Sequence, residues 1–174
     1  MKENCNIDLN CLTTILNSKI VDFVYKYYVP EAGRVFAEVK IVNLAKLPIP
    51  NATEEQQNSL SQKAERMIEL NKSLQEETKK AIELIELEYK PKKVSQNLLS
   101  FYTLGLNPFI EELEKQGVKL SLTQKEDLIS WYKTKSDQLN KIKSEIDTLD
   151  RQIDQEVYKL YNLTPEEINL IKDY

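Results

Sequence analysis

Three aspartates near the C-terminal end of the chain have a spacing that could support chemistry. Asp147, Asp150 and Asp154 follow one another at intervals of three and four residues, so they share one flank of a helix. Such a stripe of carboxylates could bind a metal ion or act in general acid–base catalysis. Each aspartate comes directly after an apolar position of the same helix, and buried unpaired aspartates are rare. The pattern therefore favours a solvated helix flank.

The chain has 174 residues and no histidine. It therefore has no serine–histidine or cysteine–histidine pair and no histidine-ligated metal, and it lacks the commonest general base. Cys5 and Cys11 are too few for a disulfide framework or a cysteine metal site. Gly33, Gly105 and Gly117 form no phosphate-binding loop. The composition disfavours a free-standing enzyme.

The start of the chain, MKENCNID, has no apolar signal-peptide core. No apolar run approaches the roughly 20 residues that a membrane span requires. These features and the isolated cysteines predict a reduced, cytoplasmic protein with no membrane partner. The net charge of −4 does not by itself indicate nucleic-acid binding.

The predicted long helices carry a net negative charge, whereas the segments before and between them are mildly basic. Residues 53–88 contain five basic and nine acidic side chains, whereas residues 89–121 contain five basic and three acidic ones. If the chain contacts DNA phosphate, we expect the contact at the N-terminal extended segment or in the loop after the first long helix. The candidate contacts are Arg34, Lys40, Lys90, Lys92 and Lys93. The alternative is that the three loop lysines only keep the loop soluble.

Four aromatic residues have two interpretations. Phe101, Tyr102, Trp131 and Tyr132 could stack on nucleobases. Aromatic residues in an irregular connector more often fill the core where that connector packs on helices. We therefore predict that these four side chains are core.

Two long helices are predicted at residues 54–89 and 124–161. The pairs Thr53–Gln56 and Thr123–Glu126 are capping boxes at their starts. Along both helices apolar residues recur every three or four positions, which predicts an antiparallel coiled-coil-like pair within the chain. The first seam comprises Leu60, Ala64, Met67, Leu74, Ala81 and Ile85 with polar Asn71 and Thr78, and the second comprises Leu139, Ile142, Ile146, Leu149, Ile153, Val157 and Leu160.

Shorter elements complete a mostly α fold. A helix is predicted at residues 9–28, with Asp8 as its cap. In residues 35–42, Val35, Ala37, Val39 and Ile41 alternate with Phe36, Glu38 and Lys40, which predicts a short strand or extended segment.

Two short helices are predicted in the second half of the chain. The first covers residues 108–116, with Asn107 as its cap and Gly117 as its stop signal. The second covers residues 165–172 and begins with a capping box at Thr164.

The stretch from Asp150 to Ile168 has the pattern DRxIDxxVYxLYxLTxEEI. It resembles the C-terminal end of type II restriction–modification adenine-N6 DNA methyltransferases, including the fused type IIG restriction–methylation enzymes. Leu16–Ile20 with the aromatic stretch after it, and Ile41–Pro50 with its LPIP ending, resemble the target-recognition (TaqI-like specificity) segment of that family. Leu120–Trp131 resembles the spacer before the terminal helix of the fused enzymes.

The resemblance implies a non-catalytic part of such an enzyme. The family's methyltransferase domain has an Asn/Asp-Pro-Pro-Tyr/Phe motif, and Asn107-Pro108-Phe109 lacks the second proline. We therefore expect no catalytic, cofactor-binding or metal-binding residue here, and S-adenosylmethionine only in a methyltransferase domain that this chain lacks. Residues 1–52 are interpreted as a remnant of the target-recognition domain, and residues 53–174 as a helical hairpin or spacer with a C-terminal docking helix. Together they are expected to form one structural unit and to be a fragment of a larger enzyme.

The partners implied by the resemblance are DNA, through the parent enzyme, and the methyltransferase domain of the same or a neighbouring chain. Residues of the family pattern are predicted to form a docking corner that turns the chain back on itself. The docking corner comprises Asp150, Arg151, Ile153, Asp154, Val157, Tyr158, Leu160, Tyr161, Leu163, Thr164, Glu167 and Ile168.

An alternative hypothesis explains the two seams without any DNA role. The chain would then be a structural coiled-coil protein that dimerises through the same apolar positions. The two hypotheses differ in whether the seams pair within one chain or between two chains.

Overall fold

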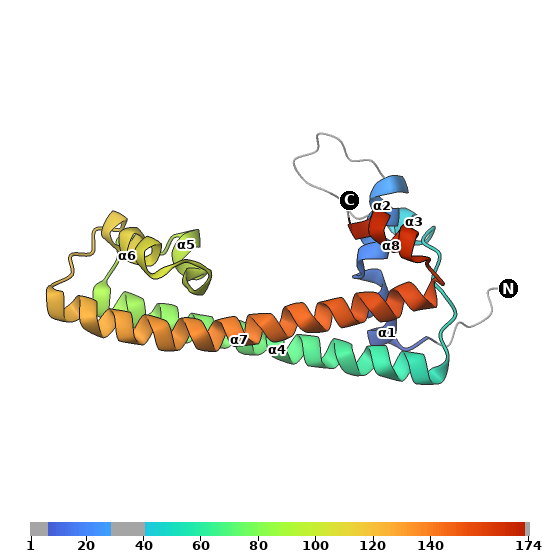
Figure 1. The fold of residues 1–174 in the computed structure, drawn as a ribbon, viewed down its shortest axis with the longest axis horizontal. Helices are drawn as coiled ribbons and strands as arrows, with labels where there is room; N and C mark the ends of the chain where they lie inside the picture. Colours follow the sequence, from blue (N-terminus) through green and yellow to red (C-terminus); the bar gives the residue numbers. More distant parts are fainter. Residues whose placement is uncertain (1–6, 29–40, 173–174) are drawn as a thin grey trace. The chain divides into compact units, whose positions relative to one another are not determined.

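The computed structural model describes residues 7–28 and 41–172, and these residues are mostly helical (Figure 1). They contain no strand. None of the helices in this part of the chain combines the length and apolar character needed to cross a membrane. The elements are α1 Leu9–Leu16, α2 Lys19–Tyr28, α3 Ile41–Leu44, α4 Glu54–Tyr89, α5 Gln96–Leu99, the 3₁₀ helix η1 Phe101–Thr103, α6 Leu106–Lys115, α7 Leu122–Leu160 and α8 Pro165–Lys172.

The chain divides into two compact units, each with its own core. The first unit comprises Met1–Met67 and Thr148–Tyr174, and the second comprises Ile68–Asp147. The long helices α4 and α7 contribute residues to both units, and in each unit they pack together (Figure 1). The predicted pairing of two long helices is confirmed in this coarse form.

In the first unit, α1, α2 and α8 pack on the beginning of α4 and the end of α7. Asp8 joins α1 to α4: its Oδ1 accepts a hydrogen bond from the Cys11 amide at 3.0 Å and another from the Ser61 hydroxyl. The Ser61 hydrogen bond is the main cause that lowers the pKa of Asp8. The buried core comprises Cys11, Ile15, Ile20, Val21, Leu47, Leu60, Ile153, Val157, Tyr158 and Ile171.

In the second unit, α5, η1 and α6 cover the pair formed by α4 and α7. Phe101 stacks on Trp131 with ring centroids 5.5 Å apart, and Phe109 stacks on Tyr132 with centroids 4.9 Å apart. Phe101, Phe109 and Tyr132 are buried. Of the four aromatic residues predicted to be core, Phe101 and Tyr132 are therefore buried, and Tyr102 and Trp131 pack partly buried against the same core. The base-stacking interpretation is removed for the two buried rings.

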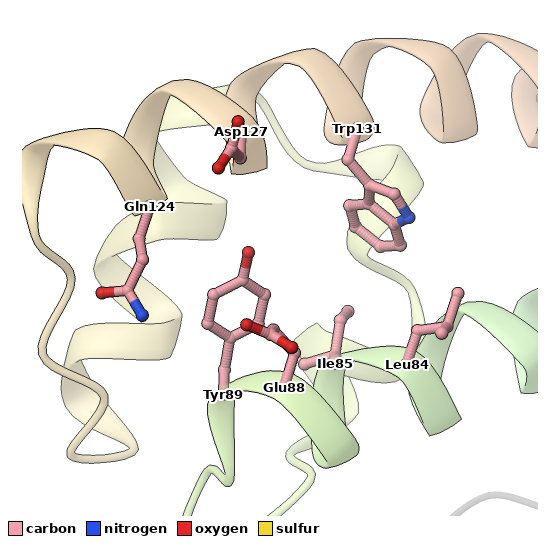
Figure 2. A pocket seen from close by; sticks show the side chains of 7 residues that line it. All are labelled: Leu84, Ile85, Glu88, Tyr89, Gln124, Asp127 and Trp131. Carbon is pink, nitrogen blue, oxygen red and sulfur yellow. The ribbon is translucent and has the colours of Figure 1, made fainter.

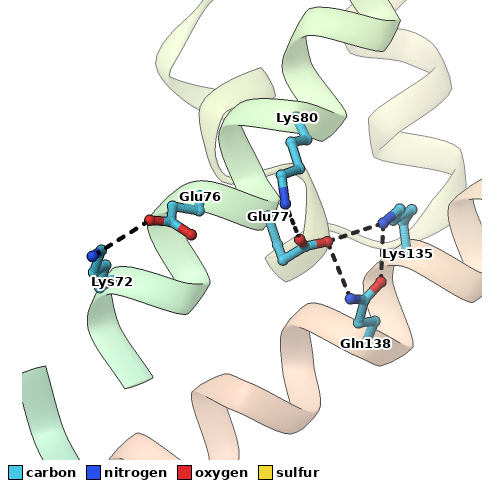
Figure 3. Close-up of polar contacts among 6 residues, drawn as sticks. All are labelled: Lys72, Glu76, Glu77, Lys80, Lys135 and Gln138. Atoms are coloured by element: carbon cyan, nitrogen blue, oxygen red, sulfur yellow. Dashed lines mark hydrogen bonds and ion pairs between the residues drawn. The ribbon is translucent and has the colours of Figure 1, made fainter. Parts of the chain in front are cut away.

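Polar contacts also join α4 to α7 in the second unit (Figure 3). Glu77 of α4 accepts hydrogen bonds from Lys135 at 3.3 Å and from Gln138 at 3.2 Å, both on α7. Lys80 reaches the other oxygen of Glu77 at 2.7 Å. The hydrogen bond from Lys80 and then that from Lys135 lower the pKa of Glu77.

The predicted α4 seam is correct in most positions and wrong in one. Leu60, Ala81 and Ile85 are buried as expected. Asn71 is exposed, and the neighbouring Leu70 is buried instead. Burying an aliphatic side chain rather than an amide avoids the cost of desolvating a polar group.

The bounds of α4 and α8 match the predictions because their capping boxes form. Gln56 Oε1 accepts from the Thr53 amide at 2.9 Å, and Glu167 Oε2 accepts from the Thr164 amide at 2.8 Å. The start of α7 was predicted wrongly. Its box is Ser121–Gln124, with the Ser121 amide 3.0 Å from Gln124 Oε1, so the helix begins at Leu122.

The start of α6 was also predicted too late. Gly105 is the N-cap and the helix begins at Leu106, which places Pro108 in the first turn. Proline is tolerated there because amides of the first turn have no partner within the helix. The predicted stop at Gly117 is confirmed: its φ is 85°, and the Val118 amide donates to Leu113 O at 3.1 Å.

The single helix predicted at 9–28 is two helices. It breaks at Asn17 and Ser18, where the Ser18 hydroxyl donates to Ile15 O at 2.7 Å. The strand predicted at 35–42 lies mainly outside the described residues. Its last two positions, Ile41 and Val42, belong to α3, so the prediction is wrong for them.

Candidate functional site

The docking corner predicted from the family pattern lies in the first unit. Ile153, Asp154, Val157 and Tyr158 are buried there. Leu160, Tyr161, Leu163 and Ile168 pack partly buried against the same core, whereas Asp150, Arg151, Thr164 and Glu167 are exposed. Eight residues of the docking corner are therefore buried or partly buried, and the other four cap α8 or face solvent.

The chain reverses direction after α7 through local turn chemistry. Asn162 has a φ of 53°, a left-handed conformation that asparagine tolerates better than most residues. The Leu163 amide then donates to Tyr158 O at 3.1 Å, which closes the end of α7. Thr164 starts α8 directly afterwards. These bonds fix the direction in which α8 leaves.

Asp154 links the docking corner to the N-terminal helices. Its Oδ1 accepts from the Lys19 amide at 3.0 Å, and its Oδ2 forms an ion pair with Lys19 Nζ at 3.1 Å. Asp154 is only 4% exposed, so the predicted solvated flank is wrong for this residue. The carboxylate occupies the position of a cap for α2, because it takes the amide at the start of that helix. The hydrogen bond that the Lys19 ammonium group donates to Asp154 is the main cause that raises the pKa of Lys19.

A second contact joins the docking corner to the N-terminal segment. The Tyr161 hydroxyl donates to the carbonyl of Pro48 at 2.7 Å. Pro48 belongs to the LPIP stretch before α4. The docking corner therefore contacts the N-terminal part of the chain at two separate places, the start of α2 and the proline-rich stretch.

The other two aspartates of the stripe do not join Asp154 in a site. Asp147 pairs with Lys143 one turn earlier, and Asp150 is exposed. In the described ranges, no group of three or more acidic, histidine or cysteine side chains is arranged to hold a metal ion. Asp154 therefore acts as a structural acceptor.

The predicted phosphate contacts lie in different places. Arg34 and Lys40 fall outside the described residues. Lys90, Lys92 and Lys93 are exposed in the loop after α4, in the second unit. Lys90 has a positive φ of 46° at the end of the helix.

The structure adds two lysines that the sequence did not single out. The Lys92 amide donates to Gln116 O at 2.9 Å, so the 90–93 loop lies against the turn between α6 and α7. Lys115 at the end of α6 and Lys119 in that turn are both exposed. We call the set Lys90, Lys92, Lys93, Lys115 and Lys119 the lysine end. Within the described residues, none of the five forms an ion pair.

Gly117 permits the close approach of the two loops. A Cβ at this position would lie 2.9 Å from Lys92 Cε, and the backbone conformation is left-handed. The sequence marks Gly117 as a helix stop. Its second role, making room for Lys92, depends on a contact between distant residues and is visible only in the fold.

Glu112 joins the helices next to the lysine end through three hydrogen bonds. The carboxylate accepts from Ser95 Oγ at 2.6 Å, from Gln116 Nε2 at 3.1 Å and from Asn97 Nδ2 at 3.3 Å. The hydrogen bond from Ser95 is the largest of the causes that lower the pKa of Glu112 below its ordinary value of 4.5. Ser95 also caps α5, so Glu112 joins α5 to α6.

The lowered pKa of Glu112 predicts loss of stability in acid. The unfolded chain takes up the proton first as the pH falls, so the stabilisation is complete above the ordinary value of 4.5 and declines below it. We expect Glu112→Gln to lower the free energy of unfolding at neutral pH by about 1 kcal/mol and to flatten this acid dependence. Urea unfolding followed by Trp131 emission at several pH values measures both effects. The exposed neighbour gives the control Glu111→Gln, and equal pH profiles for both variants would contradict the prediction.

Three more basic side chains line a shallow depression in the first unit. Its volume is about 500 Å³, and it is lined by Lys63, Thr148, Arg151, Gln152, Gln155, Glu156 and Lys159. Lys63 pairs with Glu156 at 2.8 Å, and Arg151 donates to the Thr148 hydroxyl at 3.2 Å. These contacts compete with any external anion, so the lysine end is the better candidate for phosphate.

Comparison with known protein families gives matches to two parts of the chain. Residues 1–49 match the TaqI-like C-terminal specificity domain, so the predicted resemblance to the target-recognition part of restriction–modification enzymes is confirmed. This segment contains α1, α2, α3 and Pro48, the partners of the docking corner. The matched domain is a specificity domain, not a catalytic one.

The second match covers most of the remaining chain and shows the family to which the chain belongs. Residues 53–157 match the family described as a domain of unknown function (DUF8810), and because this match covers more than half of the sequence, the chain belongs to that family. The two matches are separated at the extended stretch before α4. Neither the curated proteins nor the solved structures gave a match to the chain.

Proposed function

We propose that this chain is the non-catalytic specificity and helical part of a restriction–modification DNA adenine-N6 methyltransferase, and that it positions the recognition domain on DNA in the cytoplasm. The match of residues 1–49 to a specificity domain carries the proposal. In this proposal residues 1–52 belong to the target-recognition domain. Residues 53–174 are a spacer in which α4 and α7 run as an antiparallel coiled-coil-like pair.

The contacts of the docking corner support a positioning role. Asp154 and Tyr161 hold the start of α2 and the carbonyl of Pro48, both within the specificity match. A recognition segment anchored at two points loses less orientational freedom when it binds DNA. S-adenosylmethionine and the methyl-transfer step belong to a methyltransferase domain of the same or a neighbouring chain.

The lysine end supplies the proposed phosphate contacts. Its five exposed ammonium groups are gathered by the Lys92–Gln116 contact. Phosphate contacts of this kind give affinity without sequence preference, and they weaken as salt rises. In this proposal the specificity segment provides the preference for a DNA sequence.

We expect the triple variant Lys90→Gln, Lys92→Gln, Lys93→Gln to weaken binding to duplex DNA and to reduce its salt dependence. If all three contact phosphate, the slope of log Kobs against log salt becomes shallower by about 2.7. Fluorescence anisotropy of labelled duplex DNA at several salt concentrations measures the slope. The weakening should be the same for specific and non-specific sequences.

The control removes the same charge from lysines that already have carboxylate partners. Lys72, Lys79 and Lys143 face Glu76, Glu83 and Asp147. The corresponding triple glutamine variant should leave the salt slope within about 1 of the native value. An identical loss in both triple variants would mean that overall charge, and not the lysine end, determines DNA binding.

Exposed apolar side chains favour a second candidate function, dimerisation through the long helices without a DNA role. Ile68, Leu87 and Leu122 are 63%, 74% and 77% exposed, although α4 and α7 already pack on each other. Sedimentation at several protein concentrations tests this candidate. A concentration-independent monomer excludes it, and a tight dimer that does not bind DNA would replace the first proposal.

A further inference from the structure

A pocket in the second unit combines an aromatic wall with two carboxylates (Figure 2). Its volume is about 300 Å³. None of its lining residues is basic. They are Leu84, Ile85, Glu88 and Tyr89 of α4, and Gln124, Asp127 and Trp131 of α7.

The side chains converge on one space from the two helices. Figure 2 shows Tyr89 and Glu88 rising from α4, with Asp127 and Trp131 reaching down from α7 on the opposite side. Burial raises the pKa of Tyr89, and the charges of Glu88 and Asp127 raise it further. Both carboxylates therefore act on the phenol at the centre of the pocket.

Trp131 is held in place by two aromatic neighbours. Its ring stacks on Phe101 with centroids 5.5 Å apart and on Phe109 with centroids 6.5 Å apart. A fixed indole loses little conformational entropy when a ligand packs on it. The aliphatic wall of Leu84 and Ile85 completes an apolar lining beside the acidic groups.

We propose that this pocket binds a guanidinium group on an aliphatic stem, presented as the arginine side chain of a partner protein segment. A planar guanidinium stacks on an indole, and its N–H groups match carboxylate oxygens in pairs. The aliphatic stem suits the lining from Leu84 and Ile85. Within the described part of the chain, neither Glu88 nor Asp127 has an ion-pair partner, and no lining residue is basic, so the pocket is complementary in charge to this group.

The size of the pocket favours a single side chain. Ligand pockets usually have volumes of about 300–1,000 Å³, so this one lies at the small end of the range. It is too small for a nucleotide cofactor and large enough for one arginine side chain. Leu84 is 49% exposed, so apolar surface continues outward and can take the neighbouring residues of a peptide. This inference is independent of the proposed DNA role.

The single tryptophan of the chain makes the pocket directly observable. We expect the full chain to show a saturable change in Trp131 emission with the capped tripeptide Ala-Arg-Ala, with a Kd of about 1 mM. The citrulline tripeptide, which has nearly the same shape without the charge, should bind at least about tenfold more weakly. Free butylguanidinium should also bind more weakly than the arginine peptide, because it lacks the flanking contacts.

Variants assign the response to the pocket. Asp127→Asn should weaken the binding of the arginine peptide at least about tenfold. Glu86 is exposed on α4 outside the pocket, so Glu86→Gln should leave the binding of this peptide unchanged. Equal binding of arginine and citrulline peptides, or no saturable change, would overturn the proposal. Butylguanidinium binding as tightly as the peptide would overturn the assignment to a protein segment. Duplex DNA affinity measured on the same variants separates this result from the function proposed above.

Discussion

Replacing Phe101 by alanine is expected to lower the free energy of unfolding of the second unit by about 4 kcal/mol. Phe101 is fully buried and lies against Phe109, Trp131 and Tyr132. The substitution removes the apolar area of the ring and leaves a cavity that rigid neighbours cannot fill. Urea unfolding monitored by Trp131 emission measures the loss. The native emission should also shift to longer wavelength, because water gains access to the indole.

The matched control for this prediction is Leu99→Ala. Leu99 lies two positions earlier in the same connector, and its side chain is 44% exposed. Its truncation should cost less than about 1 kcal/mol and leave the emission of Trp131 unchanged. A similar loss for the two variants would indicate that the connector stabilises the unit through its backbone path and not through the aromatic core.

The elements that the sequence predicted well are those whose signals are local. The start of α4 follows from Thr53 and Gln56, which are three residues apart, and its end from Lys90 and Pro91 directly after it. The start of α8 follows from Thr164 in the same way. Capping boxes and prolines act within a few residues, so a single sequence contains all the information that they need.

Where two local signals compete, the sequence cannot choose between them. Ser121–Gln124 and Thr123–Glu126 both fit a capping box and overlap by two positions. The fold uses the first box. The turn before α7, where the Lys92 amide donates to Gln116 O, has a partner distant in sequence that neither box reveals.

The features that the sequence missed depend on distant partners. The apolar pattern of residues 9–28 continues across Asn17 and Ser18, so it hides the break between α1 and α2. The break is stabilised by Asp154, which is 135 positions from Lys19. The same distance explains the wrong prediction of a solvated Asp154, because nothing near it in sequence provides its partner. Lys115 and Lys119 joined the lysine end only through contacts between two loops.

Replacing Asp154 by alanine is expected to destabilise the first unit by about 2 kcal/mol. The Lys19 amide at the start of α2 loses its acceptor at a place where residue Asp154 is only 4% exposed. Most of the loss comes from this hydrogen bond, since the Lys19 side chain is 53% exposed and water screens its ion pair. Hydrogen exchange of the α2 amides measures the effect, with an expected acceleration of about 30-fold.

Three further variants separate the contributions at this position. Asp154→Asn retains an acceptor for the Lys19 amide, so it should lower the free energy of unfolding less than the alanine variant does. Lys19→Met should lower it by less than about 1 kcal/mol, because the hydrogen bond from the Lys19 backbone amide remains. Tyr158→Phe is the matched core control: its hydroxyl is buried without a partner among the described atoms, so removing it should be neutral or slightly stabilising. If α2 exchanges at the native rate in Asp154→Ala, the carboxylate does not hold the specificity segment. Under the proposed function, Asp154→Ala should reduce the site-specific methylation by an enzyme that contains this chain more than Asp154→Asn does, because only the alanine variant releases α2 from the docking corner.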